Sequence, residues 1–220
     1  MDNLGDNHMK KILFQGDSIT DCGRSKEGGT RMGEGYAMLV KTQLAFENPN
    51  KYDFYNRGIS GNRIVDVYAR IKSDIINLKP DYMSLLIGVN DVWHEIEAQN
   101  GVDAEKFEKI YCMLIEEIRA ALPDIKIMIL EPFCLRGPAT DNTEAKPDKW
   151  NIFHSEVRKR AEKAKAVAEK YGLVYVELQK HFDELAKTAE NTYWLSDGVH
   201  PTYMGHEMIK REWLKAFEEL

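Results

Sequence analysis

Three side chains in this sequence have the types and spacing of a nucleophilic catalytic group. Ser18 follows a short apolar run and a glycine, so a tight turn should hold its hydroxyl out of the core. Asp197 and His200 lie three positions apart near the other end of the chain. A serine hydroxyl is a weak nucleophile at neutral pH, and it needs a histidine as general base and a carboxylate that orients the histidine. We therefore predict Ser18 as the nucleophile, His200 as the base and Asp197 as its orienting group.

Two further segments offer hydrogen-bond donors for an oxygen that becomes negative when a carbonyl is attacked. Gly58 can offer its backbone N–H, and Asn90 can offer its side-chain amide. The backbone N–H of Ser18 is a third candidate. Donors placed around a developing oxyanion lower the barrier of acyl transfer. We predict an oxyanion hole that consists of Ser18, Gly58 and Asn90.

The hydrophobic pattern predicts the elements that position these residues. Apolar runs typical of strands lie at 11–15, 52–56, 82–87, 126–130 and 173–177, and amphipathic helical patterns lie at 35–46, 64–77, 104–122, 151–171 and 204–217. Strict alternation of strand and helix favours right-handed crossovers between parallel strands. The sequence therefore predicts an α/β protein, a three-layer α/β/α sandwich around about five parallel strands.

Ligands of such sheets bind beyond the carboxyl ends of the strands. Ser18 and the segments 56–62, 88–93 and 131–133 all follow predicted strands, so we expect them to meet at one rim. The polar segment 136–149 contains two prolines and is the one long irregular insertion. It is a candidate to rim or cover the site.

Length and composition limit the domain organisation and the partners. The chain has 220 residues, 43% of them hydrophobic and 30% charged, which is enough for one sizeable core. We expect a single domain over 11–220, preceded by a flexible leader over 1–10. The net charge of −6 is spread along helical patterns, which disfavours a nucleic-acid partner and favours a small or neutral molecule.

The cysteines and the N-terminal residues bear on compartment and metal binding. The three cysteines lack CxxC spacing, and the histidines lack the spacing of metal ligands. We therefore predict free thiols and no metal site. The first ten residues are polar, and no segment approaches about 18 consecutive apolar residues. These features predict a cytoplasmic protein without a membrane partner.

The catalytic candidates form four blocks that resemble a known family. The blocks are Gly16-Asp17-Ser18-Ile19, Gly58, Gly88-Val89-Asn90-Asp91 and Asp197-Gly198-Val199-His200. Their order is similar to that of the SGNH or GDSL esterases, and the resemblance runs from about residue 11 to the C-terminus. It implies a flavodoxin-like fold, no cofactor, and for each candidate the role predicted above.

A narrower resemblance concerns the substrate. Motifs at 16–23, 58–62, 79–81, 87–93 and 205–206 are similar to those of intracellular bacterial acetylxylan esterases. This implies removal of O-acetyl groups from small carbohydrates, in particular acetylated xylo-oligosaccharides. One alternative is an SGNH hydrolase of the lysophospholipase or thioesterase type that acts on longer acyl esters. A non-enzymatic alternative is a flavodoxin-like module that binds a nucleotide or flavin, although the Asp17 carboxylate occupies the place of an anion.

Four side chains near the predicted rim are candidates to contact a sugar. Aromatic faces of Trp93, Trp194 and Phe133 can stack on a sugar ring, and core packing is the competing interpretation of each. Trp93 is the first choice, because it follows Asn90 by three residues. Arg63 can donate hydrogen bonds to sugar hydroxyls, or it can form a surface ion pair.

Other notable residues have plainer interpretations. Cys22 lies close to Ser18 but has no histidine partner that the sequence indicates, so we interpret it as a small buried residue. His206 is interpreted as a helix-packing or capping residue. Met208 and Trp213 lie on the last helical pattern, where they leave room for a homo-oligomer contact as well as for core packing.

Overall fold

A five-stranded parallel sheet forms the centre of the molecule in the computed structural model, which describes residues 9–25 and 31–220. The strands are β1 (Lys10–Gly16), β2 (Tyr52–Asn56), β3 (Tyr82–Leu86), β4 (Lys126–Leu130) and β5 (Val174–Val176), in the order β2-β1-β3-β4-β5. This is the flavodoxin-like order, and its topological switch point lies between β1 and β3. The predicted fold class is confirmed. Most of the predicted leader, residues 1–8, lies outside the described residues, while Lys10 already belongs to β1.

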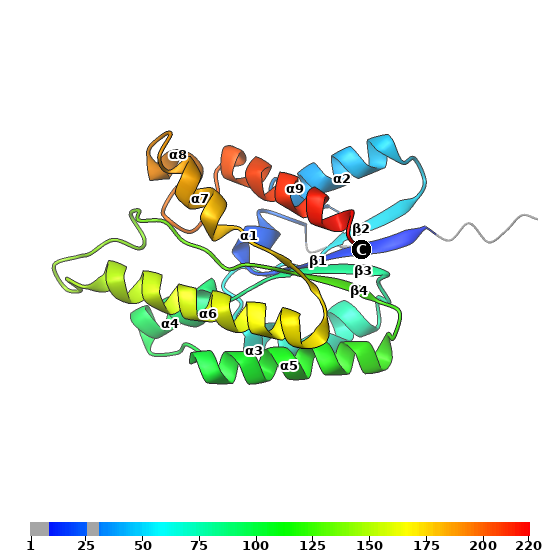
Figure 1. The fold of residues 1–220 in the computed structure, drawn as a ribbon, viewed down its shortest axis with the longest axis horizontal. Coiled ribbons are helices and arrows are strands. Elements are labelled where there is room, and N and C mark those ends of the chain that lie inside the picture. Colours follow the sequence, from blue (N-terminus) through cyan, green and yellow to red (C-terminus); the bar gives the residue numbers. More distant parts are fainter. Residues whose placement is uncertain (1–8, 26–30) are drawn as a thin grey trace, which may run out of the picture.

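Helices cover both faces of the sheet (Figure 1). One face carries α2 (Tyr36–Glu47) and α9 (Tyr203–Phe217), and the other carries α3 (Ile64–Ala69), its continuation η1 (Lys72–Ile76), α5 (Ala104–Ala121) and α6 (Lys149–Tyr171). Side chains of β1 alternate between the two cores: Ile12 and Phe14 pack with α9, and Leu13 packs with α5. Strands buried on both faces therefore appear in the sequence as continuous apolar runs.

The structure differs from the predicted elements beside the switch point. No helix was predicted over 88–93, yet β3 leads almost directly into α4 (Val89–Ala98), with Gly88 as its N-cap residue at a φ of 135°. The predicted helix over 64–77 is divided, because α3 ends at Ala69 and a wider π turn follows. Three short helices were not predicted: α1 (Ser18–Asp21), α7 (Gln179–Leu185) and α8 (Asn191–Trp194).

Within residues 9–25 and 31–220, none of the helices combines the length and the apolar character that a membrane crossing requires.

Candidate active site

Ser18 begins the short helix α1, directly after the end of β1. The turn before it requires glycine, because a Cβ atom on Gly16 would lie 2.3 Å from the carbonyl oxygen of Leu86 on β3. Asp17 caps α1, and its Oδ1 accepts a hydrogen bond of 3.0 Å from the backbone N–H of Ile19. The close passage past β3 and the cap together turn the chain sharply. They leave the Ser18 side chain at the carboxyl edge of the sheet, as the strand pattern predicts.

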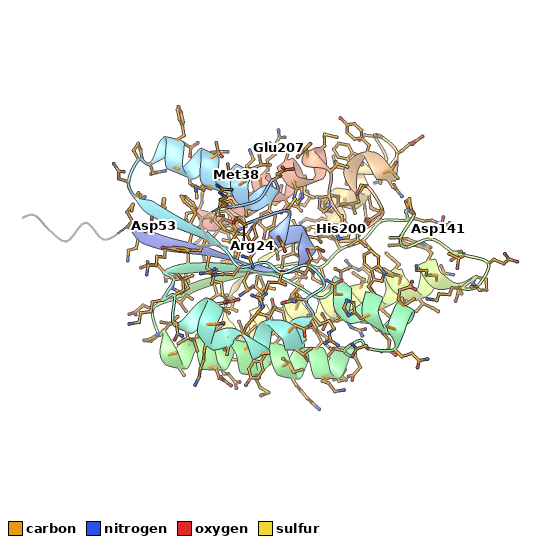
Figure 2. All side chains as sticks on the ribbon, turned by 180° about the vertical axis from the view of Figure 1, so that it is seen from behind. Arg24, Met38, Asp53, Asp141, His200 and Glu207 are labelled. Atoms are coloured by element: carbon orange, nitrogen blue, oxygen red, sulfur yellow. The ribbon has the colours of Figure 1, made fainter. Side chains whose placement is uncertain are left out.

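The loop between α8 and α9 brings the histidine to this serine. Ser18 Oγ lies 2.9 Å from His200 Nε2, and His200 Nδ1 lies 2.7 Å from Asp197 Oδ2. The other carboxylate oxygen of Asp197 accepts backbone N–H groups of Val199 and His200 at 2.9 and 2.8 Å. The structure thus brings the three predicted side chains into one hydrogen-bonded line. Figure 2 shows His200 beside α1, at the end of the molecule opposite Asp53 of β2.

The electrostatics of this line suit a base that must be neutral before reaction and cationic during it. Burial acts to raise the pKa of Asp197, but hydrogen bonds from the His200 side chain and from the two backbone N–H groups lower it to about 2. The Asp197 carboxylate raises the pKa of His200, while partial burial opposes this shift. Because Asp197 stays ionised, Nδ1 carries a proton that it donates to Asp197, and Nε2 is left to accept the proton of Ser18.

Of the three predicted oxyanion donors, two have an N–H group available. No hydrogen bond from the Ser18 backbone N–H is seen among the described residues. Asn90 is 6% exposed, and its amide donates one hydrogen bond of 3.1 Å to the carbonyl oxygen of Asn62, which leaves its second N–H available. The Gly58 N–H instead donates to Asn56 Oδ1 at 2.9 Å, so an oxyanion must share this donor with Asn56.

Gly58 also has a steric reason to be glycine. A Cβ atom at this position would lie 2.4 Å from the backbone nitrogen of Asp21 and 2.9 Å from the carbonyl oxygen of Asp17. The loop after β2 therefore passes directly against α1. Asp21 fastens this loop further, because its Oδ2 accepts the backbone N–H of Ser60 at 3.1 Å.

A pocket of about 480 Å³ opens beside Ser18 and His200. Its lining includes Ser18 and His200 and four residues of α4, which are Asn90, Trp93, His94 and Glu97. The four α4 positions are spaced i, i+3, i+4 and i+7, which places them on one face of a helix. His94 and Glu97 were not predicted as site residues, because their helical spacing has meaning only once α4 is recognised as a helix.

Trp93 is the one predicted sugar contact that lines this pocket. Its ring lies 5.8 Å from the His200 ring and 5.9 Å from the Phe153 ring, measured between centroids. Trp93 therefore contacts the core at Phe153 and also lies beside His200.

The structure does not bring Phe133, Trp194 and Arg63, the other three predicted sugar contacts, into the lining of this pocket. Phe133 is fully buried against Phe182, with ring centroids 4.4 Å apart. Trp194 ends α8 and lines a separate groove beside α9. Arg63 forms the alternative ion pair, in which its Nε lies 2.9 Å from Asp66 Oδ2 at the start of α3. In each case sequence proximity to a rim loop does not give the direction of the side chain.

The irregular segment 136–149 contacts both the loop that carries Asp197 and helix α4. At one end the backbone N–H of Ala139 donates to the carbonyl oxygen of Asp197 at 2.8 Å. At the other end Lys146 and Lys149 form ion pairs with Glu97 of α4. The segment therefore runs from the loop that carries Asp197 and His200 to Glu97 in the pocket lining. In Figure 2, Asp141 marks its outer part, beyond His200.

Comparison with known proteins shows the family of this chain. The model of the GDSL-like lipase/acylhydrolase family matches residues 14–208, which include all of the residues discussed above at the site. The chain belongs to this family. As a member with an acetylxylan esterase among its relatives, it is a carboxylic ester hydrolase.

Two relatives match along nearly the whole chain. An acetylxylan esterase of Geobacillus stearothermophilus is 32% identical over 94% of this chain and 93% of its own. Its solved structure superposes with a TM-score of 0.81. The crystal structure of a putative GDSL-like lipase from Parabacteroides merdae has a TM-score of 0.86 at 33% identity, and the match covers 96% of this chain and 98% of that one.

Solved variants of the Geobacillus esterase mark its own catalytic residues. In three catalytic mutants a serine, an aspartate, and a histidine three positions after this aspartate are each replaced by alanine. Another solved variant replaces the tryptophan directly before that aspartate. In the present chain the residue directly before Asp197 is Ser196.

Proposed function

We propose that this chain removes O-acetyl groups from small carbohydrates, with Ser18, His200 and Asp197 as its catalytic triad. The observation that carries the proposal is the continuous line of hydrogen bonds from Ser18 Oγ through His200 to Asp197, at 2.9 and 2.7 Å. A serine, an aspartate and a histidine with the same Asp-to-His spacing are the catalytic residues of the Geobacillus acetylxylan esterase, which supports the assignment.

The geometry supports a two-step acyl transfer. Ser18 Oγ attacks the carbonyl carbon of the ester while its proton moves to His200 Nε2, and Asp197 stabilises the imidazolium that forms. The carbonyl oxygen becomes negative and accepts hydrogen bonds from the Ser18 N–H and the Asn90 amide, with Gly58 as a shared donor. His200 then gives the proton to the departing sugar oxygen. In the second step His200 takes a proton from water, which attacks the acetyl carbonyl carbon. The bond from this carbon to Ser18 Oγ then breaks, His200 returns the proton to Oγ, and acetate leaves.

Acetylated xylo-oligosaccharides are the proposed substrates. The support is the activity named for the Geobacillus relative, together with a pocket much larger than an acetyl group. A pocket of this size suits a small ligand. An aromatic ring beside the histidine that must protonate the leaving oxygen suits a sugar alcohol.

The test compares ester hydrolysis by the wild type and by Ser18→Ala. We expect the wild type to prefer p-nitrophenyl acetate over the butyrate and octanoate, and to release acetate from acetylated xylobiose. Ser18→Ala should lose at least about 10⁴-fold in kcat, because the remaining groups supply neither nucleophile nor acyl acceptor. Activity that survives in Ser18→Ala would overturn the triad. A preference for octanoate that disappears with Ser18 would keep the triad and move the substrate to longer acyl esters.

A further inference from the structure

Side chains of helix α4 form one wall of the pocket, and this wall extends away from Ser18 and His200. Asn90 lies in its first turn beside Ser18, Trp93 follows next to His200, and His94 and Glu97 line the pocket one turn further on. Seven residues of α helix separate the first from the last position, a rise of about 10 Å. The wall therefore extends well past the space that an acetyl group fills.

The far end of this wall is charged and held in place. Glu97 Oε1 lies 2.7 Å from Lys149 Nζ, and Glu97 Oε2 pairs with Lys146 Nζ. Hydrogen bonds from Lys146 and then Lys149 lower the pKa of Glu97, so it remains a carboxylate near neutral pH. Each carboxylate oxygen can accept more than one hydrogen bond. With its side chain still 40% exposed toward solvent and pocket, Glu97 can accept from a ligand as well.

The wall changes from the Trp93 ring to the Glu97 carboxylate, and this change favours the alcohol part of an ester over its acyl part. The alcohol part must lie near His200, which gives its proton to the leaving oxygen, and Trp93 is the aromatic residue next to His200. An acyl tail directed along the same wall would place methylene groups against the Glu97 carboxylate, which is costly to desolvate. A sugar suits both parts, because its apolar face can stack on an indole and its hydroxyls can donate to a carboxylate.

We infer that Trp93, His94 and Glu97 form the binding subsite for the alcohol part of the ester, a sugar whose hydroxyl groups donate hydrogen bonds to the Glu97 carboxylate. The inference rests on the proposed esterase function and adds to it the side of the nucleophile on which the sugar lies. The ion pairs with Lys146 and Lys149 fix the orientation of the Glu97 carboxylate that accepts the sugar hydroxyls.

The test uses the free sugar as a probe, because a product that occupies the alcohol subsite must inhibit acylation. Xylobiose should inhibit hydrolysis of p-nitrophenyl acetate by the wild type competitively. Glu97→Gln, which keeps the shape and removes the charge, should raise the inhibition constant about tenfold. The same variant should lower kcat/KM for acetylated xylobiose relative to that for p-nitrophenyl acetate by a similar factor.

Two further variants separate direct contact from general effects of charge removal. Glu177→Gln is the matched control, because Glu177 is also 40% exposed and is paired with two lysines, Lys165 and Lys180, away from the site. Its inhibition constant should equal that of the wild type. Lys146→Gln loosens the support of Glu97 but keeps the carboxylate, so its effect should be smaller than that of Glu97→Gln.

Three outcomes would overturn the subsite. These are no inhibition of the wild type by xylobiose, an equal inhibition constant in Glu97→Gln, or an effect of Lys146→Gln as large as that of Glu97→Gln. A change in acyl-chain preference in Glu97→Gln would instead assign this wall to the acyl group, which also contradicts the inference. All of these results are independent of Ser18→Ala, whose residual activity tests the esterase mechanism itself.

Discussion

The short helix α1 carries a nucleophile beside a histidine at each of its two ends. Ser18 begins the helix and lies 2.9 Å from His200 Nε2. Cys22 caps its other end, and its Sγ lies 3.4 Å from His206 Nε2. The expectation that Cys22 lacks a histidine partner is therefore wrong. The two pairs lie on the same helix, yet only one of them borders the pocket.

The difference lies in the group on the far side of each histidine. His200 donates to the Asp197 carboxylate, which raises the pKa of the imidazole. His206 Nδ1 instead accepts the backbone N–H of Tyr36 at 3.2 Å, and burial lowers the pKa of His206 to about 4. Burial also raises the pKa of the Cys22 thiol. The second pair is thus a neutral thiol and a neutral imidazole that pack together.

A nucleophile next to a histidine is therefore not sufficient for a catalytic site. The Ser18 pair has an anion that stabilises the imidazolium and donors that stabilise an oxyanion, whereas the Cys22 pair is held by packing. The interpretation of His206 as a packing residue agrees with its 2% exposure. We can test this contrast by removing in turn the features that distinguish the two ends.

The largest effect is expected from Asp197→Asn. The amide cannot stabilise the imidazolium, so kcat should fall about 10³- to 10⁴-fold. His200 must be neutral to act as a base, so activity of the wild type should decrease as the pH falls through its raised pKa. Without the carboxylate this pKa is lower, and the acid limb of kcat/KM should move to lower pH.

The measurement is a pH profile of p-nitrophenyl acetate hydrolysis for both proteins. Cys22→Ser is the matched control at the other end of α1. Its acid limb should coincide with that of the wild type, because Cys22 lies outside the pocket lining. An acid limb that stays in place in Asp197→Asn would show that another group sets it.

The site also shows which features can be predicted from the sequence. The four blocks predict a triad and its donors because each is a short local motif near the end of a predicted strand, and the alternating pattern predicts that these strands share one sheet. Side-chain direction is not local information. Trp93 points to the pocket because α4 begins at Val89, whereas Phe133 turns into the core against Phe182. Both residues are aromatic, so their residue type does not predict which of them lines the pocket.

Sequence analysis also does not show whether a predicted hydrogen-bond donor already has a partner. The Gly58 N–H is engaged by Asn56 Oδ1, and only the three-dimensional path of the loop after β2 reveals this. The pairing of Cys22 with His206 has the same origin, because 184 positions separate the two residues in the chain. A contact of this range depends on how α1 lies against α9 in the folded chain, and local sequence does not show this.

Asn90→Ala should give the next largest effect. It removes the side-chain donor of the predicted oxyanion hole. Asn90 and Ser18 line the same pocket, and Cys22 does not line it. Loss of one such donor typically costs about 3 kcal/mol in the transition state, so kcat should fall about 10²- to 10³-fold with little change in KM. Asn90→Asp, of similar shape, should fall further because its carboxylate repels the oxyanion. Nearly equal kcat values for wild type and Asn90→Ala would remove Asn90 from the mechanism.

The smallest effect concerns stability at the Cys22 end. In the unfolded chain His206 should take up a proton near pH 6.5, whereas in the folded state its pKa is about 4. Between these values the unfolded state binds more protons, so the stability from His206 is complete above pH 6.5 and is lost as the pH falls. From pH 7 to pH 5 the loss should be about 2 kcal/mol.

The comparison of the wild type with His206→Asn isolates this contribution. Asn can still accept the Tyr36 N–H but does not titrate, so the stability difference between the two proteins in urea should shift by about 2 kcal/mol between pH 7 and pH 5. The difference is needed because Asp17, whose pKa burial raises to about 7, has the opposite pH dependence in the same range. Both proteins contain Asp17, so its contribution cancels. A stability difference independent of pH would mean that the pKa of His206 is the same in the folded and the unfolded state, which would contradict a neutral, buried imidazole at this end of α1.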